Sequence, residues 1–137
     1  MKQTILGGVL CVVLSNVAYA QGTNIHSRLG ECGSHTVITA DTQSYCYEAT
    51  ISGTTLAYVA TLDVFHNGVR KASFLQTVLI PPPVHAFNAP IAMESWGLKP
   101  GDTITFSLKV VSLSGGKILA HHVTYGDVVE AIRTTTN

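Results

Sequence analysis

Apolar and polar residues alternate strictly over residues 103–111, which is the clearest pattern in the chain. The apolar positions are Ile104, Phe106, Leu108 and Val110, and threonine, serine or lysine occupies the positions between them. A period of two places one set of side chains on each face of a sheet. The pattern therefore predicts an antiparallel strand with one buried face and one solvent-facing face.

Two further strands are predicted around the dipeptide Asn67-Gly68. The runs 56–66 and 69–80 are rich in β-forming residues, and Asn-Gly is the preferred pair for a two-residue hairpin turn. Three consecutive prolines at 81–83 end the second run because proline has no N–H to donate to a ladder. The run 84–92 contains a proline and predicts an edge strand.

The N-terminal part of the chain predicts a hairpin. The runs 36–39 and 45–51 are rich in β-branched and aromatic residues and flank turn-forming residues. Residues 21–30 are polar, contain glycine and show no period, so we expect them to form an irregular lead-in to that hairpin.

The C-terminal part predicts two more strands, over 117–125 and 128–132, with a turn at Gly126-Asp127. No window repeats apolar residues at helical spacing. Seven or eight short strands predict an all-β fold, an antiparallel immunoglobulin-like β-sandwich, with a small closed β-barrel as the alternative. The predicted division is a sandwich body over 56–133, a disulfide-linked N-terminal part over 21–55 and a tail over 134–137.

The stretch Leu-Lys-Pro-Gly-Asp-Thr-Ile-Thr-Phe at 98–106 resembles bacterial immunoglobulin-like modules, as does the layout of 56–132 in general. The resemblance implies a β-sandwich. The chain departs from antibody domains because Cys32 and Cys46 are too close in sequence to join the two sheets, and Trp96 does not lie between two cysteines.

The first 20 residues have the composition of a secretory signal peptide. Lys2 supplies a positive start, Ile5 to Leu14 are apolar, and Ala18-Tyr19-Ala20 is a small-residue cleavage site. The apolar run is about half the length of a membrane span, which argues against an anchor. We expect the mature chain to begin at Gln21, to be secreted or periplasmic, and to have no transmembrane segment.

Composition narrows the classes of function. Apolar residues make up 46% of the chain and charged residues 12%, which is the balance of a folded domain. Eight basic and eight acidic residues give a formal net charge of zero, so the sequence argues against nucleic acid as a partner. Two cysteines remain after cleavage, Cys32 and Cys46, and an exported chain with one pair is expected to bridge them.

Histidine is frequent, so metal binding is the first chemistry to consider. The six histidines are His26, His35, His66, His85, His121 and His122. None of the common spacings that place two imidazoles on one ion occurs, and the adjacent His121 and His122 face opposite sides of a strand. The spacing therefore predicts no metal site and no cofactor.

Sequence patterns of catalysis are also missing. No Gly-x-Ser-x-Gly elbow occurs, and Asp102 and Asp127 each follow a glycine, where aspartate commonly closes a turn through its side chain. We predict a non-enzymatic protein without catalytic residues. An enzyme would require a pocket that holds a histidine within hydrogen-bond reach of a serine or carboxylate.

The segment from Pro81 to Trp96 combines a rigid proline run with aromatic and amide side chains, and it is the predicted binding region. The candidate contact residues are His85, Phe87, Asn88 and Trp96. Aromatic residues there suit a sugar ring or a pocket on a partner protein. The competing interpretation is that Phe87 and Trp96 enter the core.

The predicted function is an exported non-enzymatic binding or structural module of a bacterial-type cell envelope or the extracellular space. It would act through protein–protein or surface-ligand contacts, with a protein partner or a surface glycan as its target and self-assembly through edge strands as one form. The alternative is a small periplasmic carrier of a ligand or metal that uses the histidines and the loop from Pro81 to Trp96.

Overall fold

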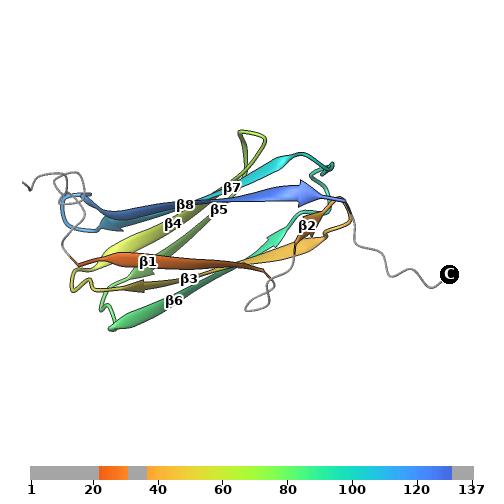
Figure 1. Cartoon of the computed structure of the whole chain (residues 1–137). Helices are drawn as coiled ribbons and strands as arrows, with labels where there is room; N and C mark the ends of the chain where they lie inside the picture. Colours follow the sequence, from red (N-terminus) through yellow and green to blue (C-terminus); the bar gives the residue numbers. More distant parts are fainter. Residues whose placement is uncertain (1–21, 31–36, 131–137) are drawn as a thin grey trace, which may run out of the picture.

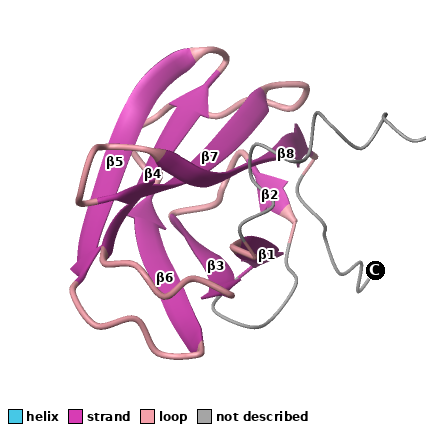
Figure 2. Ribbon diagram, turned by 90° about the vertical axis from the view of Figure 1, so that its left-hand side faces the viewer, coloured by secondary structure: helices cyan, strands magenta, loops and turns pink. Residues whose placement is uncertain are grey.

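Two packed β-sheets make up the computed structural model, which describes residues 22–30 and 37–130 and contains no helix within them (Figure 1; Figure 2). The strands are β1 (Asn24–Gly30), β2 (Ile38–Thr39), β3 (Ser44–Ser52), β4 (Tyr58–His66), β5 (Val69–Val78), β6 (Val84–Ala92), β7 (Thr103–Ser112) and β8 (Ile118–Val129). One sheet has the order β1-β3-β6 and the other β2-β8-β7-β4-β5. The predicted all-β sandwich of seven or eight strands is confirmed.

The hairpin predicted at Asn67-Gly68 is also confirmed. β4 and β5 pair antiparallel from Tyr58 opposite Val78 to His66 opposite Val69, with one register shift between Val64 and Phe65. Asn67 has a φ of 48° and Gly68 a φ of 85°, the two positive values that a type I′ turn requires.

The core is a single layer of side chains between the two sheets. On β7 every second residue is fully buried, as the alternation predicts, and β4 shows the same pattern. Tyr47 of β3 stacks on Phe106 of β7 with ring centroids 5.6 Å apart, and Tyr45 stacks on the same ring at 6.0 Å. Burial of a large apolar side chain contributes about 1.5–3 kcal/mol, so these contacts across the layer hold the sheets together.

The hairpin predicted between 36–39 and 45–51 is wrong. β2 pairs in parallel with the end of β8, with Ile38 opposite Val128, and β3 pairs with β1 and β6 instead. The reason is burial, because Ile38 is 2% exposed and covers the core edge beside β8.

The irregular lead-in predicted over 21–30 is wrong from Asn24 onward. β1 pairs antiparallel with β3 along its whole length. Its alternate residues Ile25 and Leu29 pack against the core, so a short period of two was present in this polar segment.

The turn predicted at Gly126-Asp127 is wrong as well, because β8 runs through both residues. A Cβ on Gly126 would lie 3.0 Å from Cδ1 of Ile38. Glycine therefore stands here to make room for the β2 side chain, and it does not mark a change of direction. Asp102 does close a turn, since its Oδ2 accepts a hydrogen bond of 3.0 Å from the backbone N–H of Lys99.

The signal peptide over 1–20, Cys32 and the tail over 134–137 lie outside the described residues. The Cys32–Cys46 disulfide stays a prediction. Gly30 is the register partner of Cys46, and Cys32 follows Gly30 by two residues, so the chain is long enough to form that bond. Within 22–30 and 37–130, no helix is long and apolar enough to cross a membrane.

Gly53 follows β3 and lies against Gly22, just before β1. A substitution at Gly53 therefore tests how closely these two backbone segments approach. Gly53 has a φ of 84°, and a Cβ there would lie 1.6 Å from the carbonyl oxygen of Gly22. We expect Gly53→Ala to lower the free energy of unfolding by about 3 kcal/mol or more, because the backbone must move apart. Urea denaturation measures this loss.

Gly115→Ala is the matched control, because Gly115 has a φ of 87° and no atom within 4 Å of its Cβ position. Only the conformational cost of about 1–2 kcal/mol applies there. Equal losses in the two variants would contradict the close approach of Gly22 and Gly53.

Candidate functional site

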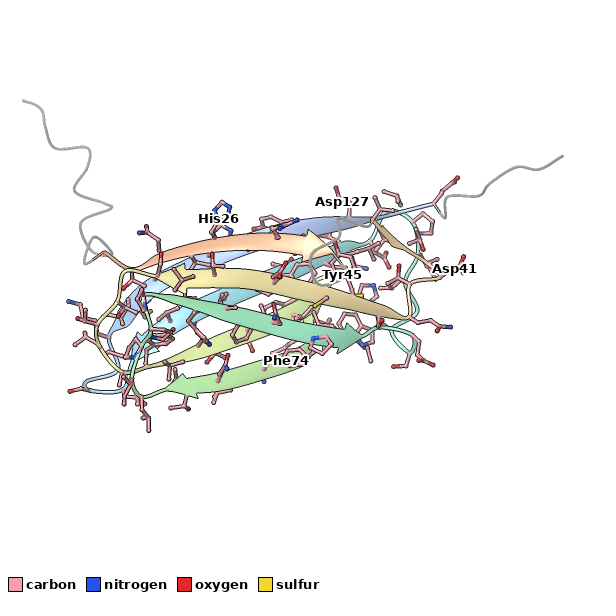
Figure 3. All side chains as sticks on the ribbon, turned by 90° about the horizontal axis from the view of Figure 1, so that it is seen from below. His26, Asp41, Tyr45, Phe74 and Asp127 are labelled. Atoms are coloured by element: carbon pink, nitrogen blue, oxygen red, sulfur yellow. The ribbon has the colours of Figure 1, made fainter. Side chains whose placement is uncertain are left out.

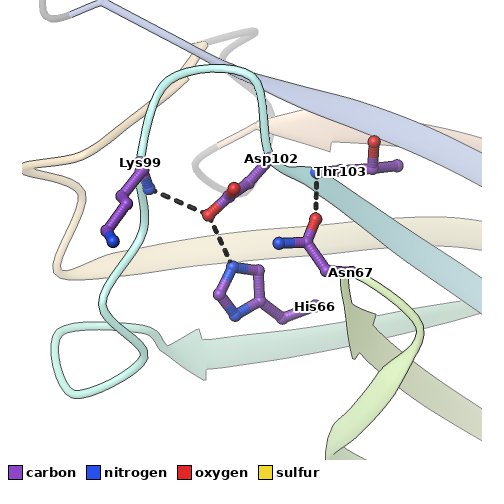
Figure 4. A network of polar contacts seen from close by, with 5 residues as sticks. All are labelled: His66, Asn67, Lys99, Asp102 and Thr103. Atoms are coloured by element: carbon purple, nitrogen blue, oxygen red, sulfur yellow. Dashed lines mark hydrogen bonds and ion pairs between the residues drawn. The ribbon is translucent and has the colours of Figure 1, made fainter.

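A polar network joins two turns at one end of the sandwich (Figure 4). His66 ends β4, and its Nε2 lies 2.7 Å from Oδ2 of Asp102, the residue before β7. A carboxylate can only accept, so the Nε2 nitrogen carries the proton. Asn67 adds a second link, because its Oδ1 accepts a 2.9 Å hydrogen bond from the backbone N–H of Thr103.

Hydrogen bonding stabilises the charged form of the Asp102 carboxyl. The bond from His66 lowers the pKa of Asp102 most, followed by Asn67 and the backbone N–H of Lys99, and the pKa falls from 3.8 to about 2. Asp102 is therefore ionised at neutral pH and holds the imidazole by a charge-assisted bond.

Trp96 completes this end of the molecule. Its ring stacks on His66 with centroids 6.4 Å apart and an interplanar angle of 20°. The indole is half-buried and packs against the core, and its neighbours in sequence Met93 and Leu98 are buried. The hydrogen-bond network and the ring stacking together hold the loop between β6 and β7 against the β4–β5 turn.

A second histidine pair links the two sheets at the other end of β4. The Tyr58 hydroxyl lies 2.9 Å from Nδ1 of His85, so β4 of one sheet contacts β6 of the other. Burial lowers the pKa of His85 and raises that of Tyr58. Both shifts favour the neutral pair, which bonds without a net charge inside the sandwich edge.

A third pair lies on the outer face of the larger sheet. The Ser107 hydroxyl is 2.7 Å from Nε2 of His121, and burial, with Lys109 and His122 nearby, lowers the pKa of His121. His66–Asp102 and Ser107–His121 thus each place a histidine within hydrogen-bond reach of a carboxylate or a serine, which is one of the features that an enzyme would require. Neither pair lines the groove described next.

A groove of about 440 Å³ runs between β5 and β6, the strands that end the two sheets on this side. Its lining residues are Phe74, Leu75, Gln76, Ala86, Phe87 and Asn88. Phe87 is buried and forms the floor, while Phe74 is half-buried and lies on the β5 side (Figure 3). The groove therefore has an apolar floor and exposed amide groups at its rim, which can both donate and accept hydrogen bonds.

The predicted binding residues do not converge on one site. His85 and Phe87 point into the sandwich, and Asn88 points outward from the same strand. His85 contacts Tyr58 at the start of β4 and Trp96 stacks on His66 at its end, and these two β4 residues are eight positions or about 26 Å apart along the strand. Phe87 and Asn88 meet at the groove, whereas Trp96 belongs to the network at the far end.

Phe74 was missed by the sequence analysis, and counting from the Asn67-Gly68 turn would not have found it. An unbroken two-residue hairpin places Ser73 opposite the buried Leu62, whereas the register shift between Val64 and Phe65 places Phe74 there and turns it inward. Asp102 and His66 are 36 residues apart, and no local pattern indicates their contact.

Within the described residues, the structure gives no support for metal binding by the histidines. There, no three His, Cys, Asp or Glu side chains lie close enough to hold one ion. His35 lies outside the described residues.

The strand orders β1-β3-β6 and β8-β7-β4-β5 are those of an immunoglobulin-like β-sandwich. No known family matches this chain, and no curated protein matches it. Among solved structures, it is similar to the CARDB domain of a protein from Pyrococcus furiosus, crystallised in complex with di-metal ions. The identity is 11%, the TM-score is 0.45, and the match covers 81% of this chain and 97% of that one.

Stability should fall as the solution is acidified below the ordinary pKa of histidine. The pKa of His85 is lowered from 6.5, so the unfolded chain takes up its proton first and the free energy of unfolding decreases as pH falls from about 6.5. We expect His85→Asn, which keeps a hydrogen-bonding group near Nδ1, to reduce this slope. Urea melts between pH 8 and pH 5 measure it, with the exposed His26→Asn as control. A slope unchanged by His85→Asn would be inconsistent with the burial that lowers the pKa of His85.

Trp96 is the single tryptophan, so its fluorescence reports on the network directly. We expect Asp102→Ala to shift the Trp96 emission to longer wavelength and to increase acrylamide quenching several-fold, because the loop loses its anchor. Asp127→Ala, which also removes an aspartate after a glycine, should leave both unchanged.

The same readout has a pH dependence. With a folded pKa of about 2, below 3.8, the contribution of Asp102 is complete above pH 4 and is lost as pH falls through 2. If acrylamide quenching of Trp96 already increases at pH 5 in the parent protein, a group other than Asp102 holds the loop.

Proposed function

We propose that this chain is an exported, non-enzymatic binding module of a cell envelope or of the extracellular space, and that it binds a protein partner along the groove between β5 and β6. The observation that carries the proposal is the difference between the two sides of the sandwich. The export part rests on the signal-peptide pattern of residues 1–20.

One side of the sandwich is closed. There, β2 extends the larger sheet by pairing with β8, and Ser27 of β1 shares a 3.1 Å hydrogen bond with Thr124 of β8. On the other side, β5 and β6 each pair with one neighbour only among the described strands. Roughly half of the backbone N–H and C=O groups of an edge strand point away from its neighbour and can pair with an added strand.

Features that discourage strand addition are confined to one half of these edges. Arg70 and Lys71 charge the beginning of β5, a register shift opposite Phe65 disturbs the same region, and Pro90 lies near the end of β6. Because β5 and β6 run in opposite directions, these features lie toward the same end. The segments 72–78 and 84–89 are left as regular edges.

The groove chemistry suits an extended polypeptide. Its edges offer backbone hydrogen bonds, and the half-buried Phe74 offers an apolar contact to a side chain of the bound segment, whereas Phe87, 2% exposed, closes the groove from below. The amides of Gln76 and Asn88 can orient the bound backbone from the rim.

Site-specific photo-crosslinking tests this function. A benzophenone side chain placed at Leu75, in the groove, should give a discrete adduct with a protein partner in the native envelope or culture fluid. The same probe at Tyr125, 66% exposed on β8, is the matched control and should give none. Crosslinks of equal yield from both positions, or from neither, would refute the groove as the binding surface.

A further inference from the structure

Exposed aliphatic side chains gather at one end of the sandwich. They are Leu56, Leu79, Ile80, Val84, Leu113 and Ile118. Leu79 is 69% exposed and Ile80 88% exposed, and both follow the last residue of β5. The other four come from the start of β4, β6 and β8 and the end of β7, at the left-hand end of Figure 1. We define the apolar end as residues 52–57, 79–84 and 113–118.

Charge is distributed unequally between the two ends. Within the apolar end, Lys117 is the single charged residue. The opposite end carries carboxylates at Asp41, Glu94, Asp102, Asp127 and Glu130 and cations at Arg70, Lys71 and Lys99. The molecule is thus polarised along its length, with aliphatic turns at one end and a surplus of negative charge at the other.

The most exposed turn is also poor in hydrogen-bond donors. Pro81, Pro82 and Pro83 have no backbone N–H, so the turn between β5 and β6 presents three fewer donors than an ordinary turn of its length. Moving an unpaired donor out of water is costly. A proline turn flanked by leucine, isoleucine and valine therefore enters an apolar phase at reduced cost.

We propose that the apolar end docks on a lipid bilayer, with the Leu79–Ile80 turn inserted among the lipid headgroups and upper acyl chains. Of the six aliphatic side chains, Leu56 alone lines a cavity among those found, a hollow of about 350 Å³ that it shares mainly with threonines, and Leu79 and Ile80 project from a separate turn. Such scattered side chains suit a fluid phase better than a shaped protein pocket. The acidic end then faces away from the lipid, so repulsion from anionic headgroups also favours this orientation.

The point of chain entry agrees with this orientation. The described chain begins at Gly22, whose backbone lies against Gly53 in the apolar end. The chain that is expected to begin at Gln21 thus enters the fold on the side that we assign to lipid.

Vesicle flotation tests the proposal with the exported chain, its N-terminus determined by mass spectrometry. The probe is a vesicle of phosphatidylcholine with about 30% phosphatidylglycerol, which gives it an anionic surface. We expect the parent protein to float with the vesicles and the double substitution Leu79→Ser with Ile80→Ser to reduce the floating fraction at least tenfold. Salt at roughly 0.5 M screens charges that are more than a few ångströms apart. Because insertion is apolar, this salt should leave vesicle binding nearly unchanged.

The matched control is Val69→Ser with Tyr125→Ser, which removes two side chains of 61% and 66% exposure outside both the apolar end and the groove. It should float like the parent, and circular dichroism checks that both variants keep their strands. A parent protein that stays with the lipid-free fraction would overturn the proposal, as would equal losses in the two double variants. The result is independent of the groove, because crosslinking at Leu75 reports on the protein partner alone.

Discussion

The stacking of Tyr47 and Tyr45 on Phe106 is the contact on which the rest of the structure depends. It joins β3 of one sheet to β7 of the other across a single layer of side chains. A core only one layer thick takes every second residue of each strand, so the outward residues, the edges and the turns are left to carry function. The Tyr58–His85 bond and the His66–Asp102 network secure the two ends of that layer.

Function in this sandwich is then a question of which edges and ends the fold leaves open. The β1–β8 side is closed by Ser27, Thr124 and β2, whereas the β5–β6 side keeps a groove with an apolar floor. The ends differ in the same way, since one is tied down by a charged network and the other presents aliphatic turns. A protein partner at the open side and a lipid surface at the apolar end are compatible, because the two surfaces share only Val84, at the start of β6.

Local patterns predicted much of the fold and little of the site. Alternation over 103–111 and the Asn67-Gly68 turn each depend on neighbours in sequence, and both predictions are confirmed. The pairing of β2 with β8 depends on the burial of Ile38 beside Gly126, which are 88 residues apart, and no local signal reports it. The groove likewise arises because β5 and β6, the edge strands of two different sheets, lie side by side. Phe87 and Asn88 could therefore be proposed from their own segment, whereas Phe74 on the other strand could not.

Hydrogen–deuterium exchange of the exported chain, free and bound in its native envelope fraction, tests the central claim that binding uses the open side. The account predicts added protection in peptides covering 72–78 and 84–89, and no change in peptides covering 118–129 of β8. Protection confined to β8 or to β1, on the closed side, would contradict it.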